Sequence, residues 1–241
     1  KKMPEEINRI ACDHMSSLLF SPTKQGINNL QKEGFKLKQK GKATMDEPNM
    51  YHCGDIMLDN SMHFGERENL GNTLLASLKL EVNKYILCTI HRDSNTDIET
   101  NLIGILEALL SCEEKTQMKI VLPLHPRTKA KIEQLKDKNF VERFIKNPNI
   151  IILPPAGFND IIVLEKNTKL IITDSGGLQK EAYFFKKPCV ILREQTEWVE
   201  IVENGNAILT GADNSKIKNA ISLLLSKNDF TYPKLFGDGK A

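Results

Sequence analysis

Several features that would point to particular classes of protein are missing from this sequence of 241 residues. Lys and Arg number 33 against 31 Asp and Glu, so neither sign of charge is in the excess that favours nucleic acid or an anionic surface. Trp198 is the only tryptophan, and no basic stripe interleaved with aromatic residues is present. No apolar run approaches the ~20 residues that a membrane-spanning helix needs. We therefore expect a cytoplasmic globular protein with no nucleic acid and no membrane partner.

Sequence patterns typical of metal and cofactor sites are also missing. None of the five cysteines (Cys12, Cys53, Cys88, Cys112 and Cys189) belongs to a CxxC pair, which favours buried free thiols over disulfides or a zinc site. No HxH or HExxH spacing occurs, so we predict no metal. Neither the GxGxxG fingerprint nor a Walker loop is present, so neither NAD nor ATP is favoured and no cofactor is expected.

What the sequence does contain, from Lys84 onward, is an alternation of short β-branched runs with helical patterns. The runs are apolar throughout, as expected for strands buried on both faces of a parallel sheet. This predicts an α/β fold with a Rossmann-like, doubly wound parallel sheet and right-handed crossovers. The predicted strands are 85–90, 119–122, 150–153, 170–173, 189–192 and 207–210, and the predicted helices lie near 98–112, 128–138, 157–167, 177–186, 196–204 and 213–226.

The first 83 residues show a different pattern. We predict a helix around 4–15, a strand at 18–20, a second helix that Pro22 and Thr23 begin and Gly34 ends, a surface loop at 36–50 and a strand at 51–53. These strands are too few to predict a separate sheet. We expect residues 1–60 to be the tail end of a truncated N-terminal Rossmann-like domain, 61–83 a linker or helix, 84–227 a C-terminal Rossmann-like domain, and 228–241 a segment returning toward the first domain. The chain reads as the middle of a longer protein.

Polar residues follow five of the predicted strands. Ligands in open α/β sheets bind beyond the carboxyl ends of the strands, so these residues are candidates for a common site. In strand order they include His91 and Arg92, then His125, then Phe158, then Ser175-Gly176-Gly177, and then Arg193. Their coincidence at one edge of the sheet predicts an anion-binding site.

The turn at Ser175-Gly176-Gly177 gives the sharpest signal. Two glycines let the backbone approach a ligand closely, and the following helix presents N–H groups at its positive end. Glu181, about one helical turn further, could accept hydrogen bonds from ribose hydroxyls. The alternative is an ordinary strand-to-helix connection in which Ser175 caps the helix.

The neighbouring candidates are ambiguous in the same way. His91 and Arg92 could contact a phosphate, and His91 could transfer a proton near neutral pH, or the histidine could merely end a strand. His125 has the same two interpretations. Phe158 could stack on a base, although core packing is the more common role of a phenylalanine near a helix start.

The sequence resembles the non-hydrolysing UDP-N-acetylglucosamine 2-epimerases, a family with the two-domain GT-B fold. The resemblance spans essentially the whole chain. It rests on Pro4-Glu5-Glu6-Ile7-Asn8-Arg9, Phe20-Ser21-Pro22-Thr23, His91-Arg92, Thr173–Ala182 (TDSGGLQKEA), Lys187-Pro188, Leu192-Arg193, Thr196-Glu197 and Gly237-Asp238-Gly239-Lys240. It implies the C-terminal half of a GT-B fold with a fragment of the N-terminal domain.

The resemblance also implies an activity. Family members remove the C2 proton of a UDP-2-acetamido sugar, expel UDP from C1 to leave a glycal, and add UDP back with C2 inverted. By this match Glu5 is a catalytic carboxylate and His91 acts between UDP and sugar. Ser175, Gly176 and Gly177 would hold the diphosphate and Glu181 the ribose, and the further contacts expected for the UDP-sugar are Arg92, Arg193, His125 and Phe158. The resemblance implies a homodimer for the full-length protein, and an inactive fragment here because further acids would lie upstream.

Some positions depart from the commonest pattern of the family. His91–Asn95, Pro123–Thr128 and Thr196–Glu200 look more like the branch that acts on UDP-2,3-diacetamido-glucuronate, which leaves the sugar open. Lys180 stands where a glutamate is common, and we expect it on an exposed helix face. Two other functions remain as alternatives: a GT-B glycosyltransferase that shares the nucleotide site, and a fragment that binds a UDP-sugar without activity.

Overall fold

The computed structural model describes residues 4–66 and 68–241, and the side chains of residues 6–66 and 73–241. It divides into two compact units, and each is described here by itself. Unit 1 runs to Met62 and includes Pro233–Ala241, whereas unit 2 is His63–Tyr232. None of the helices described over these ranges is both long and apolar enough to cross a membrane.

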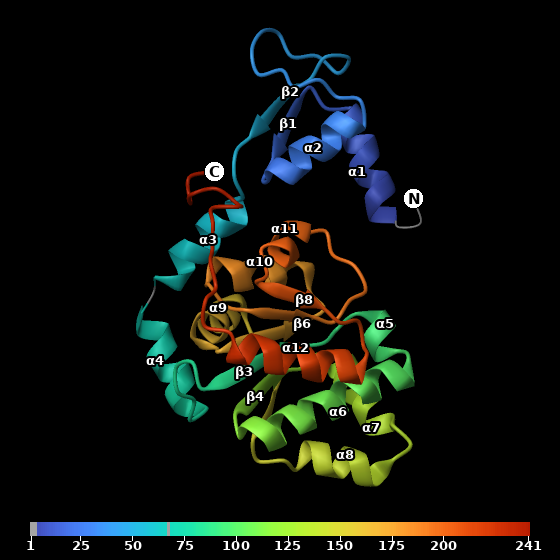
Figure 1. Ribbon diagram of the computed structural model, residues 1–241, viewed down its shortest axis with the longest axis vertical. Helices are drawn as coiled ribbons and strands as arrows, with labels where there is room; N and C mark the ends of the chain where they lie inside the picture. Colours follow the sequence, from blue (N-terminus) through green and yellow to red (C-terminus); the bar gives the residue numbers. More distant parts are fainter. Residues whose placement is uncertain (1–3, 67) are drawn as a thin grey trace. The chain divides into compact units, whose positions relative to one another are not determined.

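Unit 2 is built on a parallel sheet of six strands. Their order is β5-β4-β3-β6-β7-β8, so the chain builds outward from β3 in one direction, returns to β3, and then builds outward in the other (Figure 1). This is the doubly wound arrangement, and the order reverses between β3 and β6. All six predicted strands are confirmed. They are β3 (Tyr85–Thr89), β4 (Lys119–Pro123), β5 (Ile150–Leu153), β6 (Leu170–Thr173), β7 (Cys189–Ile191) and β8 (Ala207–Leu209).

Helices cover both faces of this sheet. Residues of α6 (Glu99–Thr116), α7 (Pro126–Gln134), α8 (Lys138–Ile145) and α12 (Asn214–Ser226) pack with one set of strand side chains. On the opposite face, the hydroxyl of Tyr85 donates to the carbonyl of Leu164 in α9 (Phe158–Asn167), which in turn contacts α10 (Gly176–Phe184) and α4 (Glu68–Ser77). Two short helices, α5 (Asp93–Thr96) and α11 (Val199–Glu203), complete the unit.

One predicted helix is wrong in its extent. The stretch 128–138 is not a single helix, because α7 ends at Gln134 and a new helix, α8, begins at Lys138. The Asp137 carboxylate caps α8 by accepting a hydrogen bond from the Phe140 N–H at 3.0 Å. A capping aspartate followed by an apolar pattern starts a helix rather than continuing one.

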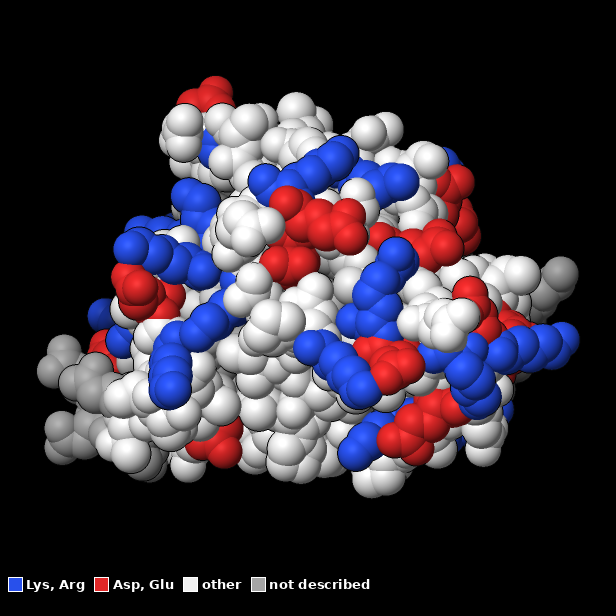
Figure 2. All heavy atoms as spheres, turned by 90° about the horizontal axis from the view of Figure 1, so that it is seen from below, with Lys and Arg blue, Asp and Glu red and all other residues white. Residues whose placement is uncertain are grey.

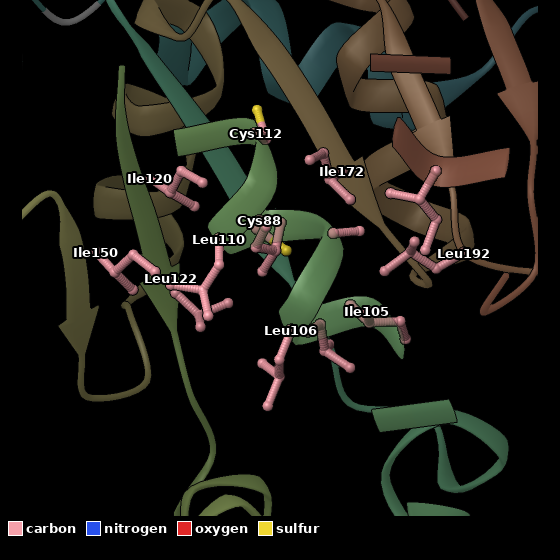
Figure 3. Packing of buried hydrophobic residues seen from close by; sticks show 14 of the residues in the cluster. Cys88, Ile105, Leu106, Leu110, Cys112, Ile120, Leu122, Ile150, Ile172 and Leu192 are labelled. Carbon is pink, nitrogen blue, oxygen red and sulfur yellow. The ribbon is translucent and has the colours of Figure 1, made fainter. Parts of the chain in front are cut away.

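The main hydrophobic core lies between the sheet and α6 (Figure 3). Alternate strand residues such as Cys88, Ile120 and Ile172 meet Ile105 and Leu106 of α6, and all are fully buried. Of the five thiols, Cys88, Cys112 and Cys189 are buried as expected. Cys12 and Cys53 are exposed, which corrects that expectation for unit 1.

Unit 1 contains α1 (Pro4–His14), β1 (Leu18–Ser21), α2 (Lys24–Lys32), β2 (Asn49–His52) and most of α3 (Ile56–Gly65). The expectation that its strands form no sheet is wrong, because β1 and β2 pair in parallel around the crossover helix α2. Thr23 caps α2 through a hydrogen bond from the Gly26 N–H, and Gly34, with φ +103, ends it as predicted. The C-terminal segment packs here, where the Asp55 N–H donates to the Phe236 carbonyl at 2.9 Å.

The charged surface shows no single-sign field on the face displayed in Figure 2. Lys and Arg side chains lie interspersed with Asp and Glu side chains there. This agrees with the near balance of charge in the sequence, a net +2.

Candidate nucleotide site

The candidate site is centred on Asp174, the residue that directly follows β6. The parallel pairing of β3 with β6 places Thr89 opposite Thr173, and their hydroxyls lie 2.7 Å apart. The two strands therefore end side by side, and the turns that follow them meet. This is the point at which the strand order reverses, where open α/β sheets bind their ligands.

Asp174 is fully buried, and it joins the two turns by hydrogen bonds. Its carboxylate accepts the backbone N–H of His91 (3.0 Å), the backbone N–H of Arg92 (2.9 Å) and the side-chain amide of Asn95 (3.0 Å). The Arg92 guanidinium returns to the Asp174 carbonyl at 3.2 Å. A buried carboxylate with this many donors holds both turns in one conformation.

His91 is tied to the same carboxylate through its ring. Its Nδ1 lies 2.8 Å from Asp174 Oδ1, and about half of the side chain remains exposed. The hydrogen bond to Asp174 raises the pKa of His91, against the opposing effect of burial. Burial alone would raise the pKa of Asp174, but hydrogen bonds from His91, Arg92 and Asn95 outweigh it and hold that pKa below its usual range. Because Nδ1 carries the proton that Asp174 accepts, Nε2 is the ring atom that exchanges protons with the surroundings.

The Ser175-Gly176-Gly177 turn opens α10. Ser175 caps the helix by accepting a hydrogen bond from the Leu178 N–H at 3.4 Å, and its own N–H donates to the Thr173 hydroxyl at 3.0 Å. Both interpretations of this turn are therefore compatible, because a helix cap leaves the first N–H groups of the helix pointing outward. A nine-residue helix with this start has a positive end suited to an anion.

Arg193 places a cation beside that helix end. Its Nη1 lies 3.7 Å from where a Cβ on Gly176 would stand, and its side chain is only 11% exposed. Both guanidinium nitrogens Nη1 and Nη2 donate to the Glu197 carboxylate at 2.8 Å. This ion pair lowers the pKa of Glu197, against the opposing effect of burial. The guanidinium is thus fixed in place next to the first turn of α10.

The loop that carries Glu197 also holds the start of α10 by hydrogen bonds. The Trp198 indole N–H donates to the Gly176 carbonyl at 2.9 Å, and the Thr196 hydroxyl donates to the Gln179 side-chain carbonyl at 2.5 Å. The sequence alone gives Trp198 no role in this site. Its bond joins residues 22 apart in the chain, and no local pattern announces such a contact.

Lys180 and Glu181, which are neighbours on α10, are both almost fully buried. Lys180 is 6% exposed, so its expected place on an exposed helix face is wrong. Its ammonium lies 4.4 Å from the centroid of the Trp198 ring, because residue 180 shares a face of α10 with Gly176 and that face is covered by the 193–198 loop. Glu181 is also 6% exposed, on the neighbouring face of the same helix.

The remaining candidates lie further from this centre. His125 caps α7, since its Nδ1 accepts the Arg127 N–H at 3.3 Å, and it follows β4, which is separated from β6 by β3. Phe158 begins α9 with 49% of its surface exposed and meets the Phe64 ring edge-on at 5.1 Å. Glu5 is in α1 of unit 1, and its side chain lies outside the described residues.

Two residues of the centre had no assigned role at the level of sequence. Asp174 lies within the Thr173–Ala182 segment and Asn95 within the His91–Asn95 segment, but the sequence indicates no function for either side chain. Their importance depends on the adjacency of β3 and β6, which lie more than 80 residues apart in the chain. The sequence shows that Asp174 ends one apolar run and that His91 and Arg92 follow another. Their hydrogen bonds can be predicted only once the strand order is known.

Comparisons of the chain with known proteins point to one family. The family model described as UDP-N-acetylglucosamine 2-epimerase matches residues 1–241. A UDP-N-acetylglucosamine 2-epimerase homolog of Methanococcus maripaludis is 40% identical over all of this chain and 62% of its own length. The UDP-2,3-diacetamido-2,3-dideoxy-D-glucuronate 2-epimerase of Pseudomonas aeruginosa is 39% identical over all of this chain and 61% of its own length.

Solved structures agree with the sequence comparisons. The Methanocaldococcus jannaschii UDP-GlcNAc 2-epimerase in complex with UDP-GlcNAc and UDP matches 99% of this chain and 62% of that chain, with a TM-score of 0.82 at 35% identity. The expected α/β class, with one half of a GT-B-like fold, is confirmed. The chain spans about three fifths of the length of the curated relatives it matches. It belongs to the UDP-N-acetylglucosamine 2-epimerase family.

Proposed function

We propose that this chain supplies the UDP-binding part of an isomerase that inverts C2 of a UDP-2-acetamido sugar. The observation that carries the proposal is the hydrogen-bonded junction at Asp174, which joins His91 to the start of α10 at the switch point of the sheet. This junction holds a helix N-terminus, an imidazole and the side chain of Arg92 around two neighbouring turns, and the Arg193–Glu197 ion pair holds a second guanidinium beside them.

The diphosphate of UDP would lie at the start of α10. The N–H groups of Gly176 and Gly177 and the hydroxyl of Ser175 provide hydrogen-bond donors, and Arg193 provides positive charge beside them. Departure of UDP from C1 increases the negative charge on its terminal phosphate. Fixed donors and a fixed cation at that position stabilise the transition state more than the bound substrate.

His91 would act between the phosphate and the sugar. Its protonated form, favoured by Asp174, can donate from Nε2 to the leaving phosphate oxygen as the C1–O bond breaks. The C2 proton goes to a carboxylate, a role proposed for Glu5 and for acids outside this chain. UDP then adds back to C1 of the glycal while a proton enters C2 from the opposite face, so the net reaction only inverts C2.

The nucleoside would extend along α9 and α10. Glu181 is one turn beyond the glycines, where its carboxylate can accept hydrogen bonds from the ribose hydroxyls. Phe158, half exposed at the start of α9, can stack on the base. His125 and Arg92 are proposed as further contacts to the UDP-sugar.

The sugar is either UDP-GlcNAc, giving UDP-ManNAc, or a 2,3-diacetamido uronate analogue. Relatives with each of these names match the chain at 35–40% identity, so both substrates belong in the test. We also propose that the complete enzyme is a cytoplasmic homodimer, on the strength of the family resemblance.

Proton NMR of each substrate with the complete protein in D2O tests the proposed reaction. We expect deuterium at C2 together with the C2-inverted product. Transfer of the sugar to an added acceptor without C2 exchange would instead indicate a GT-B glycosyltransferase. If neither substrate exchanges its C2 proton, the epimerase assignment is wrong.

A further inference from the structure

Glu165, near the end of α9, is a carboxyl group that the site described above does not use. Its side chain is fully buried, and neither carboxylate oxygen has a hydrogen-bond partner in the part of the chain that the structure describes. Buried polar atoms are nearly always paired in folded proteins, and an ionised carboxylate without a partner is especially unfavourable in the interior. Glu165 therefore retains its proton at neutral pH.

The groups around Glu165 reinforce this state. Those that interact with it electrostatically are Glu181 on α10, Tyr85 on β3 and Cys189 on β7. In the part of α4 whose side chains are described, Thr73–Ser77, no side chain is titratable. Burial, and next the nearby charge of Glu181, raise the pKa of Glu165 well above its ordinary value. Each of these groups is neutral or negative, so none of them would stabilise a charge on Glu165.

The position of Glu165 matters because its helix, α9, packs on α10, and Glu181 of α10 lies close enough to interact with it electrostatically. The inference rests on the proposed function, in which Glu181 accepts hydrogen bonds from ribose hydroxyls. Only an ionised carboxylate accepts at all of its lone pairs without competing as a donor. Two adjacent buried carboxyls do not both ionise readily, so a negative charge on Glu165 would oppose the charge that Glu181 needs.

We propose that Glu165 is a positioning residue for the nucleotide site, which holds the proton of the Glu165–Glu181 pair so that the negative charge stays on Glu181. It does not touch the ligand. It acts through Glu181, and ionisation of Glu165 at alkaline pH weakens the binding of UDP by disfavouring the charge on Glu181.

Calorimetric titration of UDP into the 241-residue chain, repeated from neutral to alkaline pH, tests this role. Glu165→Gln is neutral at every pH and keeps the shape of the protonated acid. We expect the affinity of the unmodified chain to fall about tenfold relative to Glu165→Gln as the pH rises and Glu165 ionises. Titration of UDP itself and of His91 affects both proteins equally and cancels in this ratio.

Glu113→Gln is the matched control. Glu113 is also buried, but its two oxygens accept hydrogen bonds from Asn147 and Asn149 at 2.8 and 2.7 Å, far along the chain from the site. Its variant should follow the pH profile of the unmodified chain. Parallel profiles for the unmodified chain and Glu165→Gln would overturn the proposal.

An infrared measurement without ligand separates this inference from the proposed function. The unmodified chain and Glu113→Gln should show the C=O stretch of a buried protonated carboxyl at neutral pH, and Glu165→Gln should lack it. Absence of that band from the unmodified chain overturns the inference. Failure of UDP to bind any of the proteins overturns the nucleotide site, and the positioning role with it, while the band still reports the proton on Glu165.

Discussion

At the scale of single residues, Asp174 matters most, because one buried carboxylate organises both turns of the site. Asp174→Asn replaces an acceptor of several hydrogen bonds with an amide whose NH2 group faces other donors. We expect a loss of about 2–3 kcal/mol in the free energy of unfolding, since buried donors lose their partner. Urea unfolding measures this loss, and an unchanged midpoint would show that the Asp174 bonds contribute little.

The same substitution should lower the pKa of His91, whose folded value is raised mainly by the hydrogen bond to Asp174. A raised histidine pKa stabilises the folded protein fully below the ordinary value of 6.5, and this contribution is lost as the pH rises through the raised value. Asp174 has a lowered pKa, so its contribution is present above its ordinary value of 3.8 and is lost as the pH falls through the lowered one. An NMR titration of the His91 ring in both proteins checks the shift, and equal His91 pKa values in the two proteins would contradict it.

Glu181→Ala should weaken UDP binding by about 1.5–3 kcal/mol, the range for hydrogen bonds to a charged acceptor. Glu181 is almost fully buried, so truncation also removes a side chain that packs inside the unit, and we expect Glu181→Ala to lose stability as well. Glu181→Gln keeps that volume and separates binding from folding. Equal UDP affinity in calorimetry for both variants and the unmodified chain would rule out the ribose contact.

At the scale of elements, the sequence predicted what depends on local pattern and missed what depends on adjacency. The apolar runs in the sequence located all six strands of unit 2. The pairing of β1 with β2 and the break between α7 and α8 were not predicted. The former needs a long-range contact, and the latter depends on one cap at Asp137. The expected exposure of Lys180 was wrong because the 193–198 loop, which covers it, comes from another part of the chain.

The contact between the 193–198 loop and α10 can be tested as an element. Trp198→Phe removes the hydrogen bond to the Gly176 carbonyl but retains an aromatic ring over Lys180. We expect a loss of about 1 kcal/mol in stability, the net value of one such bond, and weaker UDP binding because the helix start is held less firmly. Tyr51→Phe in unit 1 is the control: it removes a hydroxyl that donates to the Gln39 carbonyl and accepts from the Asn49 amide, and it should leave UDP affinity unchanged. Equal UDP affinity for Trp198→Phe and the control would show that the loop does not shape the site.

At the scale of the whole molecule, the described contacts of the nucleotide site all lie within unit 2. The candidate catalytic carboxylate Glu5 lies in unit 1. This separation assigns binding of the leaving group to one unit and proton transfer at C2 to residues outside it. Binding of UDP is therefore the property that we expect this chain to show by itself, whereas the proposed epimerisation also needs residues outside unit 2.

In the proposed function, the turns after β3 and β6 hold the diphosphate of UDP. An NMR titration of UDP into the isotope-labelled chain, following backbone amides, tests this claim most directly. We predict the largest shifts at Ser175, Gly176, Gly177 and His91, with small shifts throughout unit 1. Absence of binding, or shifts concentrated away from these two turns, would contradict it.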